Sequence, residues 1–376
     1  MTRVSRPPTG RRFFWLLGRA ALAALLALNG LGCESMSVFG EKDPMRAELR
    51  RLEKEQRDRS VQEQLADAAR ERERAKHPDT MEDRLKRGDA NLAAGRVAAA
   101  LWDYANAHLL NPKAAAPRER FGYVHLRKNP ERAQPLFESA LELEPNSVSG
   151  HIGLGLSMLA NGEREKGLSH LERAVELDPK SPRAQAALGV SLDQLGRREE
   201  ALKHLEAARD LRPHDARNLN NLGVAYLRAG QPERAEPLFR AALREDGSDA
   251  SLRANNLGMA LAMQGRFDEA LESFRKAGDE QSARANLGYA HYARGEYDQS
   301  ISEYEKALLA GGKANVEVVR NLEAARRARE VAQKNPSSAP AMAGAPPPPV
   351  AVPRIDPATI AGDDSPVAPP ASAAPN

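Results

Sequence analysis

The chain has 376 residues, 28% of them charged and only 5% aromatic, and it is rich in alanine, leucine, glutamate and arginine, which is typical of an all-helical protein. Its formal charge of +3 would suit a nucleic-acid partner, but five of the 55 basic residues and none of the 52 acidic ones lie in the first 32 positions. The other 344 residues are nearly neutral and lack a basic stripe with interleaved aromatic residues, which argues against nucleic acid.

The amino-terminal segment has the layout of a secretory signal. An arginine-rich region is followed by an apolar run from Ala20 to Leu28, then by small residues and Cys33, the only cysteine. A lone cysteine cannot form an internal disulfide. Leu31-Gly32-Cys33 resembles a bacterial lipoprotein signal, and this resemblance implies that the chain is cut before Cys33 and that the cysteine is acylated.

Two alternatives to the lipoprotein remain, an uncleaved membrane anchor and a soluble secreted form. The stretch 13–31 is short for a bilayer span and is interrupted by Arg19. Several acyl chains would hold the protein firmly on a membrane. Glu34 is not the aspartate that retains such lipoproteins at the inner membrane of enteric bacteria. The resemblance therefore favours the outer membrane, with the protein facing the periplasm, and leaves the inner membrane as the alternative.

The segment 43–76 is dense in arginine and glutamate and carries a broken apolar stripe that includes Met45. Asp43-Pro44 is a plausible helix start. Because the stripe does not sustain three heptads, we interpret the segment as a solvated helical spacer rather than as a self-associating coiled coil.

Residues 182–215 predict a helical hairpin. Leu188 and Leu192 recur at helical spacing up to Gly196, and a second apolar stripe runs from Ala201 towards Pro213. Gly196 is expected to adopt the left-handed conformation that ends the first helix, while Ser181 and Pro182 supply its start.

This hairpin recurs at intervals close to 34 residues. A glycine marks the eighth position of each unit, at Gly88, Gly122, Gly155, Gly189, Gly223, Gly258 and Gly288. Six units carry a second glycine seven residues later, and the remaining unit uses Asn129-Pro130 at that turn. The spacing of Leu-Gly, then Ala-x3-Phe, then Pro resembles the tetratricopeptide repeat (TPR) family.

The resemblance implies an all-α, right-handed superhelical solenoid of seven TPR hairpins, in which paired helices approach too closely for a side chain at the marker glycine. A helix with an apolar stripe from Val318 to Ala325 and arginines on the opposite side suits a closing cap. The predicted organisation is a lipoprotein signal peptide (1–32), a lipid-anchor region with the charged spacer (33–80), seven repeats (81–314), a capping helix (315–334) and a Pro/Ala-rich tail (335–376).

The tail holds twelve of the 26 prolines. Such a segment cannot bury a core, so we expect it to be extended and disordered. It is either inert, a proline-motif ligand, or a tether towards the cell wall.

No constellation for catalysis is found in the sequence. The eight histidines are scattered without the i, i+4 pairing that metal ligands on a helix favour, and no G-x-S-x-G, phosphate loop or paired cysteine motif occurs. The sequence therefore predicts a protein that is not an enzyme and that uses no cofactor and no metal.

Binding is the better prediction, because in TPR proteins the first helices of the hairpins line a concave groove. The sixth position reads Asn221, Asn256 and Asn286 in three successive units, with Asn220 and Asn255 beside two of them. Asparagine amides both donate and accept hydrogen bonds, so such a row could grip a peptide backbone. The alternative is that these residues follow the family consensus and serve only packing. The remaining groove candidates are Arg217, Val224, Met259, Tyr289 and Tyr292.

A lipoprotein signal joined to a TPR array resembles the pilus-assembly lipoproteins, both the TPR lipoprotein of tight-adherence (Flp) pilus systems and the pilotins of type IV pili. The resemblance implies a scaffold that helps a secretin to assemble in the outer membrane. The alternatives are an envelope adaptor that recruits cell-wall hydrolases or a protease, and a structural tether between membrane and cell wall.

Overall fold

The structure, a computed structural model, describes residues 45, 51, 79–126, 129–245, 250–311 and 315–334. In these ranges all regular secondary structure is helical, and none of the helices is long and apolar enough to cross a membrane. The predicted signal peptide, Cys33, nearly all of the spacer and the Pro/Ala-rich tail lie outside the described residues.

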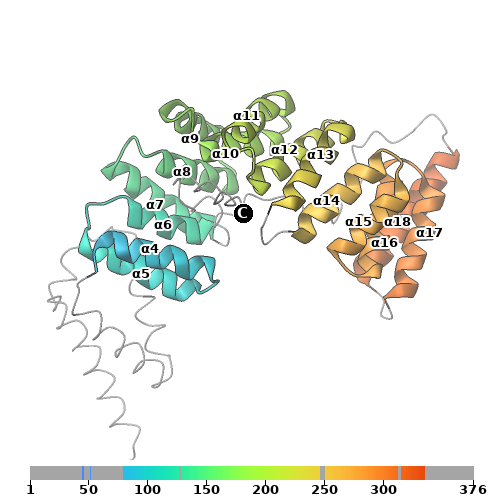
Figure 1. Ribbon diagram of the computed structural model, residues 1–376, viewed down its shortest axis with the longest axis horizontal. Coiled ribbons are helices and arrows are strands. Elements are labelled where there is room, and N and C mark those ends of the chain that lie inside the picture. The colour runs from blue at the N-terminus through green and yellow to red at the C-terminus, as the bar shows by residue number, and fades with distance from the viewer. Residues whose placement is uncertain are drawn as a thin grey trace, which may run out of the picture. The chain divides into compact units, whose positions relative to one another are not determined.

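The chain divides into two compact units, and Figure 1 labels the helices of both. The described helices of the first unit form three hairpins, α4 with α5, α6 with α7 and α8 with α9. Their bounds are Met81–Ala93 (α4), Val97–Leu110 (α5), Ala116–Leu126 (α6), Pro130–Leu143 (α7), Val148–Ala160 (α8) and Arg164–Leu177 (α9).

The second unit, from Asp178, contains four hairpins and a closing helix among its described residues. The hairpins are Pro182–Gln194 with Arg198–Leu211 (α10, α11), Ala216–Arg228 with Pro232–Arg244 (α12, α13), Ala250–Met263 with Phe267–Ala277 (α14, α15), and Glu280–Ala293 with Tyr297–Ala310 (α16, α17). The closing helix is Val316–Lys334 (α18). Seven hairpins and a cap confirm the predicted all-helical repeat fold.

The hairpin of α10 and α11 shows why the sequence folds in this way. The Ser181 hydroxyl accepts a hydrogen bond from the Ala184 N–H at 3.2 Å, and Pro182 occupies the first turn. Gly196 has φ +82°, which a residue with a side chain would adopt only under strain. The predicted cap and turn are confirmed.

Each marker glycine lies against the second helix of its hairpin, where a Cβ atom would come within 3.0 Å of an atom of that helix. A methyl group on Gly189 would come within 2.7 Å of Leu205 Cγ, and one on Gly223 within 2.6 Å of Phe239 Cε1. Leu205 and Phe239 are themselves buried. The predicted close approach is therefore confirmed, and the absence of a side chain there is a packing requirement.

Three successive hairpins each have a polar side chain near the start of their first helix (α6, α8 and α10) that bonds to the preceding loop. In each case it donates to the carbonyl oxygen of a proline six residues earlier. The bonds are Arg118 Nη1 to Pro112 O (2.8 Å), His151 Nε2 to Pro145 O (3.0 Å) and Gln185 Nε2 to Pro179 O (2.9 Å).

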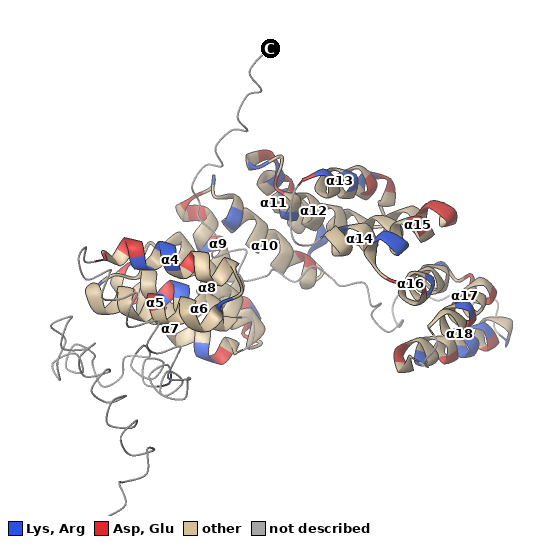
Figure 2. Cartoon of the chain, turned by 60° about the horizontal axis from the view of Figure 1, so that its bottom comes forward, with Lys and Arg blue, Asp and Glu red and all other residues tan. Residues whose placement is uncertain are grey.

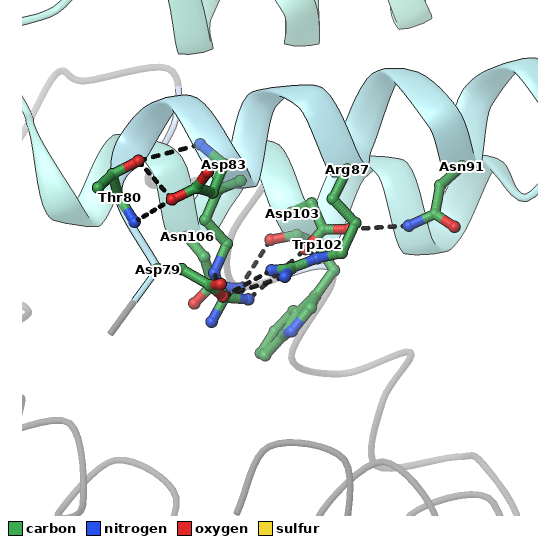
Figure 3. A network of polar contacts seen from close by, with 9 residues as sticks. Asp79, Thr80, Asp83, Arg87, Asn91, Trp102, Asp103 and Asn106 are labelled. Carbon is green, nitrogen blue, oxygen red and sulfur yellow. Dashed lines mark hydrogen bonds and ion pairs between the residues drawn. The ribbon is translucent and has the colours of Figure 1, made fainter. Parts of the chain in front are cut away.

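A network of charged and polar side chains joins α4 to α5 and to the residues just before α4 (Figure 3). Arg87 donates through Nε to Asp103 at 2.8 Å and through both Nη atoms to Asp79 at 3.0 Å. Asn91 donates to the second oxygen of Asp103 at 2.8 Å. Asp103 is only 4% exposed, so these partners compensate a carboxylate that has lost most of its water.

Met45 corrects the interpretation of the spacer at one position. Its side chain is 1% exposed and packs in the core that contains Leu101, Tyr104 and Phe121. Met45 therefore belongs to the core of the first unit and not to a solvated helix face.

The closing helix α18 buries Val318, Leu322 and Ala325 against Tyr304 of α17. Asn315 accepts hydrogen bonds from two backbone N–H groups of its first turn. Elsewhere on α18 positive and negative residues are interspersed (Figure 2), which gives this end of the second unit a polar surface.

We predict that Gly189→Ala lowers the free energy of unfolding by about 1–3 kcal/mol, because the new methyl group overpacks the contact with Leu205. Gly196→Ala should cost about 1 kcal/mol through its backbone conformation alone, since nothing lies within 4 Å of a Cβ there. Gln194→Ala, at an exposed position on α10, is the control and should change stability by less than about 0.5 kcal/mol. The measurement is the midpoint of urea unfolding, monitored by circular dichroism. Equal stability of Gly189→Ala and the control would contradict the packing argument.

Candidate functional site

The candidate site lies on three neighbouring first helices of the second unit. α12 packs beside α14, and α14 packs beside α16. Asp215 caps α12 by accepting from the Asn218 N–H at 3.0 Å, and Asp279 caps α16 by accepting from the Ser282 N–H at 2.8 Å. The predicted asparagines lie on these three helices. We call this set the asparagine face: Asn220, Asn221, Asn255, Asn256 and Asn286.

The asparagines pair diagonally from one repeat to the next. Asn256 Nδ2 donates to Asn220 Oδ1 at 2.8 Å, and Asn286 Nδ2 donates to Asn255 Oδ1 at 2.6 Å. Each bond joins the fifth position of one hairpin to the sixth position of the next. The amides therefore fasten neighbouring first helices to each other.

Burial separates the members of the asparagine face. Asn256 is fully buried, and its Oδ1 has no hydrogen-bond partner among the described residues. Asn220 and Asn255 are 4% and 9% exposed, whereas Asn221 and Asn286 are half-buried. Within the same ranges the structure gives Asn221 no side-chain hydrogen bond. Packing thus accounts for Asn256, while Asn221 keeps a donor and an acceptor for another molecule.

The other predicted groove residues fall into three groups by burial. Val224 and Met259 are 8% and 5% exposed and belong to the hydrophobic core, and Arg217 is exposed in the first turn of α12. Tyr289 and Tyr292 are half-buried on α16. Burial, with Tyr292 nearby, raises the pKa of Tyr289, so its hydroxyl keeps its proton and can donate.

The sequence analysis missed a charged pair that joins α10 to α12. Arg228 Nη1 donates to Asp193 Oδ2 at 2.7 Å, and Asp193 is only 9% exposed. The other oxygen, Oδ1, is buried and has no partner among the described residues. The two residues are 35 apart, one repeat plus one residue.

The chemistry of the site is that of binding. The asparagine face provides amide donors and acceptors beside tyrosine rings, which suits an extended polypeptide backbone. Across the part of the chain that the structure describes, no three histidine, cysteine, aspartate or glutamate side chains gather as a metal site would require.

Comparison with protein families gives two models, both described as tetratricopeptide repeat. One matches residues 186–250, 220–281 and 256–316, and the other matches residues 124–191. Together these matches run without a gap over more than half of the chain. A search of curated proteins finds no match.

Several solved structures are similar to this chain. A chain of the APC/C hetero-tetramer Cut9–Hcn1 is 18% identical with a TM-score of 0.50, and the match covers 65% of this chain and 48% of that one. This chain thus spans about half the length of that relative. The pilF protein of Pseudomonas aeruginosa is 20% identical over 57% of this chain and 98% of its own, with a TM-score of 0.45. YrrB, described as a TPR protein with an unusual peptide-binding site, is 22% identical over 50% and 97%, with a TM-score of 0.40. The match to the Cut9–Hcn1 chain, at 18% identity, indicates a shared fold.

We predict that Asn256→Ala and Asn221→Ala differ in stability. Loss of the buried amide of Asn256 leaves Asn220 without its partner and should lower the free energy of unfolding by about 1–3 kcal/mol. Asn221→Ala should change it by less than about 0.5 kcal/mol. Urea unfolding of both variants tests this, and equal destabilisation would mean that Asn221 is also part of the packing.

Proposed function

This chain belongs to the tetratricopeptide repeat family, and we propose that it is a non-enzymatic scaffold that holds an extended segment of a partner protein on the asparagine face. The observation that carries the proposal is the half-buried Asn221, whose amide forms no hydrogen bond within the described residues while its neighbours are fixed by the Asn220–Asn256 bond.

An extended polypeptide presents backbone N–H and C=O groups at about 3.3 Å per residue. The axes of neighbouring helices are about 8–10 Å apart, and α14 lies between α12 and α16. Amides on α12 and α16 would therefore contact the same backbone at points several residues apart. Asn221 offers both a donor and an acceptor, and Asn286 retains its Oδ1 as an acceptor. Bonds to the backbone do not depend on side chains, so the partner would be selected by its extended conformation and by contacts with Tyr289.

The Asn220–Asn256 and Asn255–Asn286 bonds also favour binding, because they fix these side chains before a partner binds. Because Asn220 is bonded to Asn256 and Asn255 to Asn286, the side chains around Asn221 lose little conformational entropy when a partner arrives.

We further propose that the scaffold acts in the bacterial envelope, anchored to the outer membrane through acylated Cys33 and facing the periplasm. The order of arginines, apolar run, small residues and cysteine supports this location. There the scaffold would assist assembly of a pilus or secretion-system secretin. The adaptor for a cell-wall hydrolase or a protease is the second candidate, and the membrane-to-wall tether is the third.

Capture of the partner in membranes tests the binding site. We expect Asn221→Ala combined with Asn286→Ala to weaken capture about tenfold, equivalent to about 1.4 kcal/mol, because two amides that contact the backbone are lost. The readout is the amount of partner cross-linked to the full-length protein, with Gln194→Ala as the control.

The same experiment separates the three candidates. A secretin among the captured proteins, with fewer secretin multimers in the double variant, supports pilus or secretion-system assembly. Changed hydrolase or protease activity supports the adaptor, and capture of cell-wall material alone supports the tether. Undiminished capture by a correctly folded double variant would overturn the proposed site.

The anchor is tested separately. We expect labelled palmitate to be incorporated into the full-length protein and to be lost in Cys33→Ala, because no other cysteine is available. The variant should also leave the membrane fraction. Label that persists in Cys33→Ala would exclude lipidation at this residue.

A further inference from the structure

Two histidines face each other across the hairpin of α8 and α9 in the first unit. His151 Nδ1 lies 3.0 Å from His170 Nδ1, and the two rings are stacked at 30° with centroids 5.2 Å apart. They are 19 residues apart on antiparallel helices, so no short sequence motif would reveal them.

The contact made by Nε2 of His151 determines which of its two ring nitrogens carries the proton. Nε2 lies 3.0 Å from the Pro145 carbonyl oxygen, and because a carbonyl only accepts, this nitrogen must carry the proton. In the neutral ring Nδ1 is then the nitrogen with the free electron pair, and it accepts from the Nδ1–H of His170. A histidine that ligates a metal is typically held in this way, with its second nitrogen donating to a backbone carbonyl.

The separation of the two Nδ1 atoms also fits a metal ion. Transition metals bind imidazole nitrogen at about 2.0–2.1 Å, so two nitrogens on one ion lie about 2.8–3.4 Å apart for angles between a right angle and the tetrahedral angle. The observed 3.0 Å falls within this range. Binding needs the proton on His170 to move from Nδ1 to Nε2 and both rings to turn so that their Nδ1 electron pairs meet at the ion, with no gain or loss of charge by the protein.

The pair is accessible through one of its two rings. His151 is 9% exposed but His170 is half-buried, so an ion can reach the pair from the side of α9.

The next hairpin repeats the arrangement with one ligand replaced. Gln185 occupies the place of His151 and donates to the Pro179 carbonyl, and its Oε1 lies 2.8 Å from His204 Nδ1. The histidine pair is therefore not required to close a hairpin of this kind, because a glutamine and a histidine do so 34 residues later.

We propose that His151 and His170 form a binding site for a divalent transition metal ion such as Zn²⁺ or Cu²⁺, held through both Nδ1 atoms. Since no third histidine, cysteine or carboxylate joins the pair in the described part of the chain, water completes the coordination. The ion would connect α8 to α9. The site is independent of the asparagine face, which lies in the second unit.

Titration of ZnCl₂ and CuCl₂ into the full-length, untagged protein tests this site. We expect one equivalent to bind, with a rise in the thermal unfolding midpoint that EDTA reverses. His151→Gln should abolish this equivalent while leaving the midpoint without metal nearly unchanged, because it copies the Gln185–His204 pair. His170→Gln should also abolish it.

The reverse change provides a gain of function. Gln185→His should create a second histidine pair with His204 and raise the stoichiometry from one equivalent to two. Absence of a midpoint shift in the wild-type protein would overturn the proposal. Binding that persists in both His151→Gln and His170→Gln would also overturn it, since the ion would then lie elsewhere.

Discussion

The fold depends on the close contact between the two helices of each hairpin. A glycine on the first helix faces a large side chain on the second, Leu205 for Gly189 and Phe239 for Gly223, at distances that leave no room for a methyl group. Both large side chains are buried, so the two hairpins are built around the same kind of contact. Similar hairpins then stack at similar offsets within each unit.

These offsets explain why polar contacts recur between and within hairpins. Loop prolines are held from the first turn by Arg118, His151 and Gln185 in turn, although the three side chains have different chemistry. Diagonal amide bonds likewise occur twice, between α12 and α14 and between α14 and α16. Equivalent positions of a repeat fold can therefore hold different side chains in the same contact. His151 and Gln185 are one such pair of positions, and only the hairpin with His151 has the two histidines of the proposed metal site.

The sequence predicted the hairpins, their turns and the cap well because these depend on local features. Gly196 requires a left-handed conformation, and Ser181 supplies a hydroxyl to an exposed helix start, whatever lies around them. The burial of Met45 was not predicted, because the broken apolar stripe to which it belongs does not indicate which side chains it contacts, here the core that contains Tyr104. The Asp193–Arg228 pair was missed because it depends on how α12 is displaced along α10.

The repeat, the glycine that faces the second helix of each hairpin and the asparagines on three successive first helices follow from the sequence. The folded structure adds that Asn256 is fully buried and bonded to Asn220, while Asn221 is half-buried. It also decided that His151 and His170, which no spacing rule connects, lie 3.0 Å apart. The reason is physical: helical period and turn chemistry act over a few residues, whereas the pairing of side chains depends on the register between neighbouring helices.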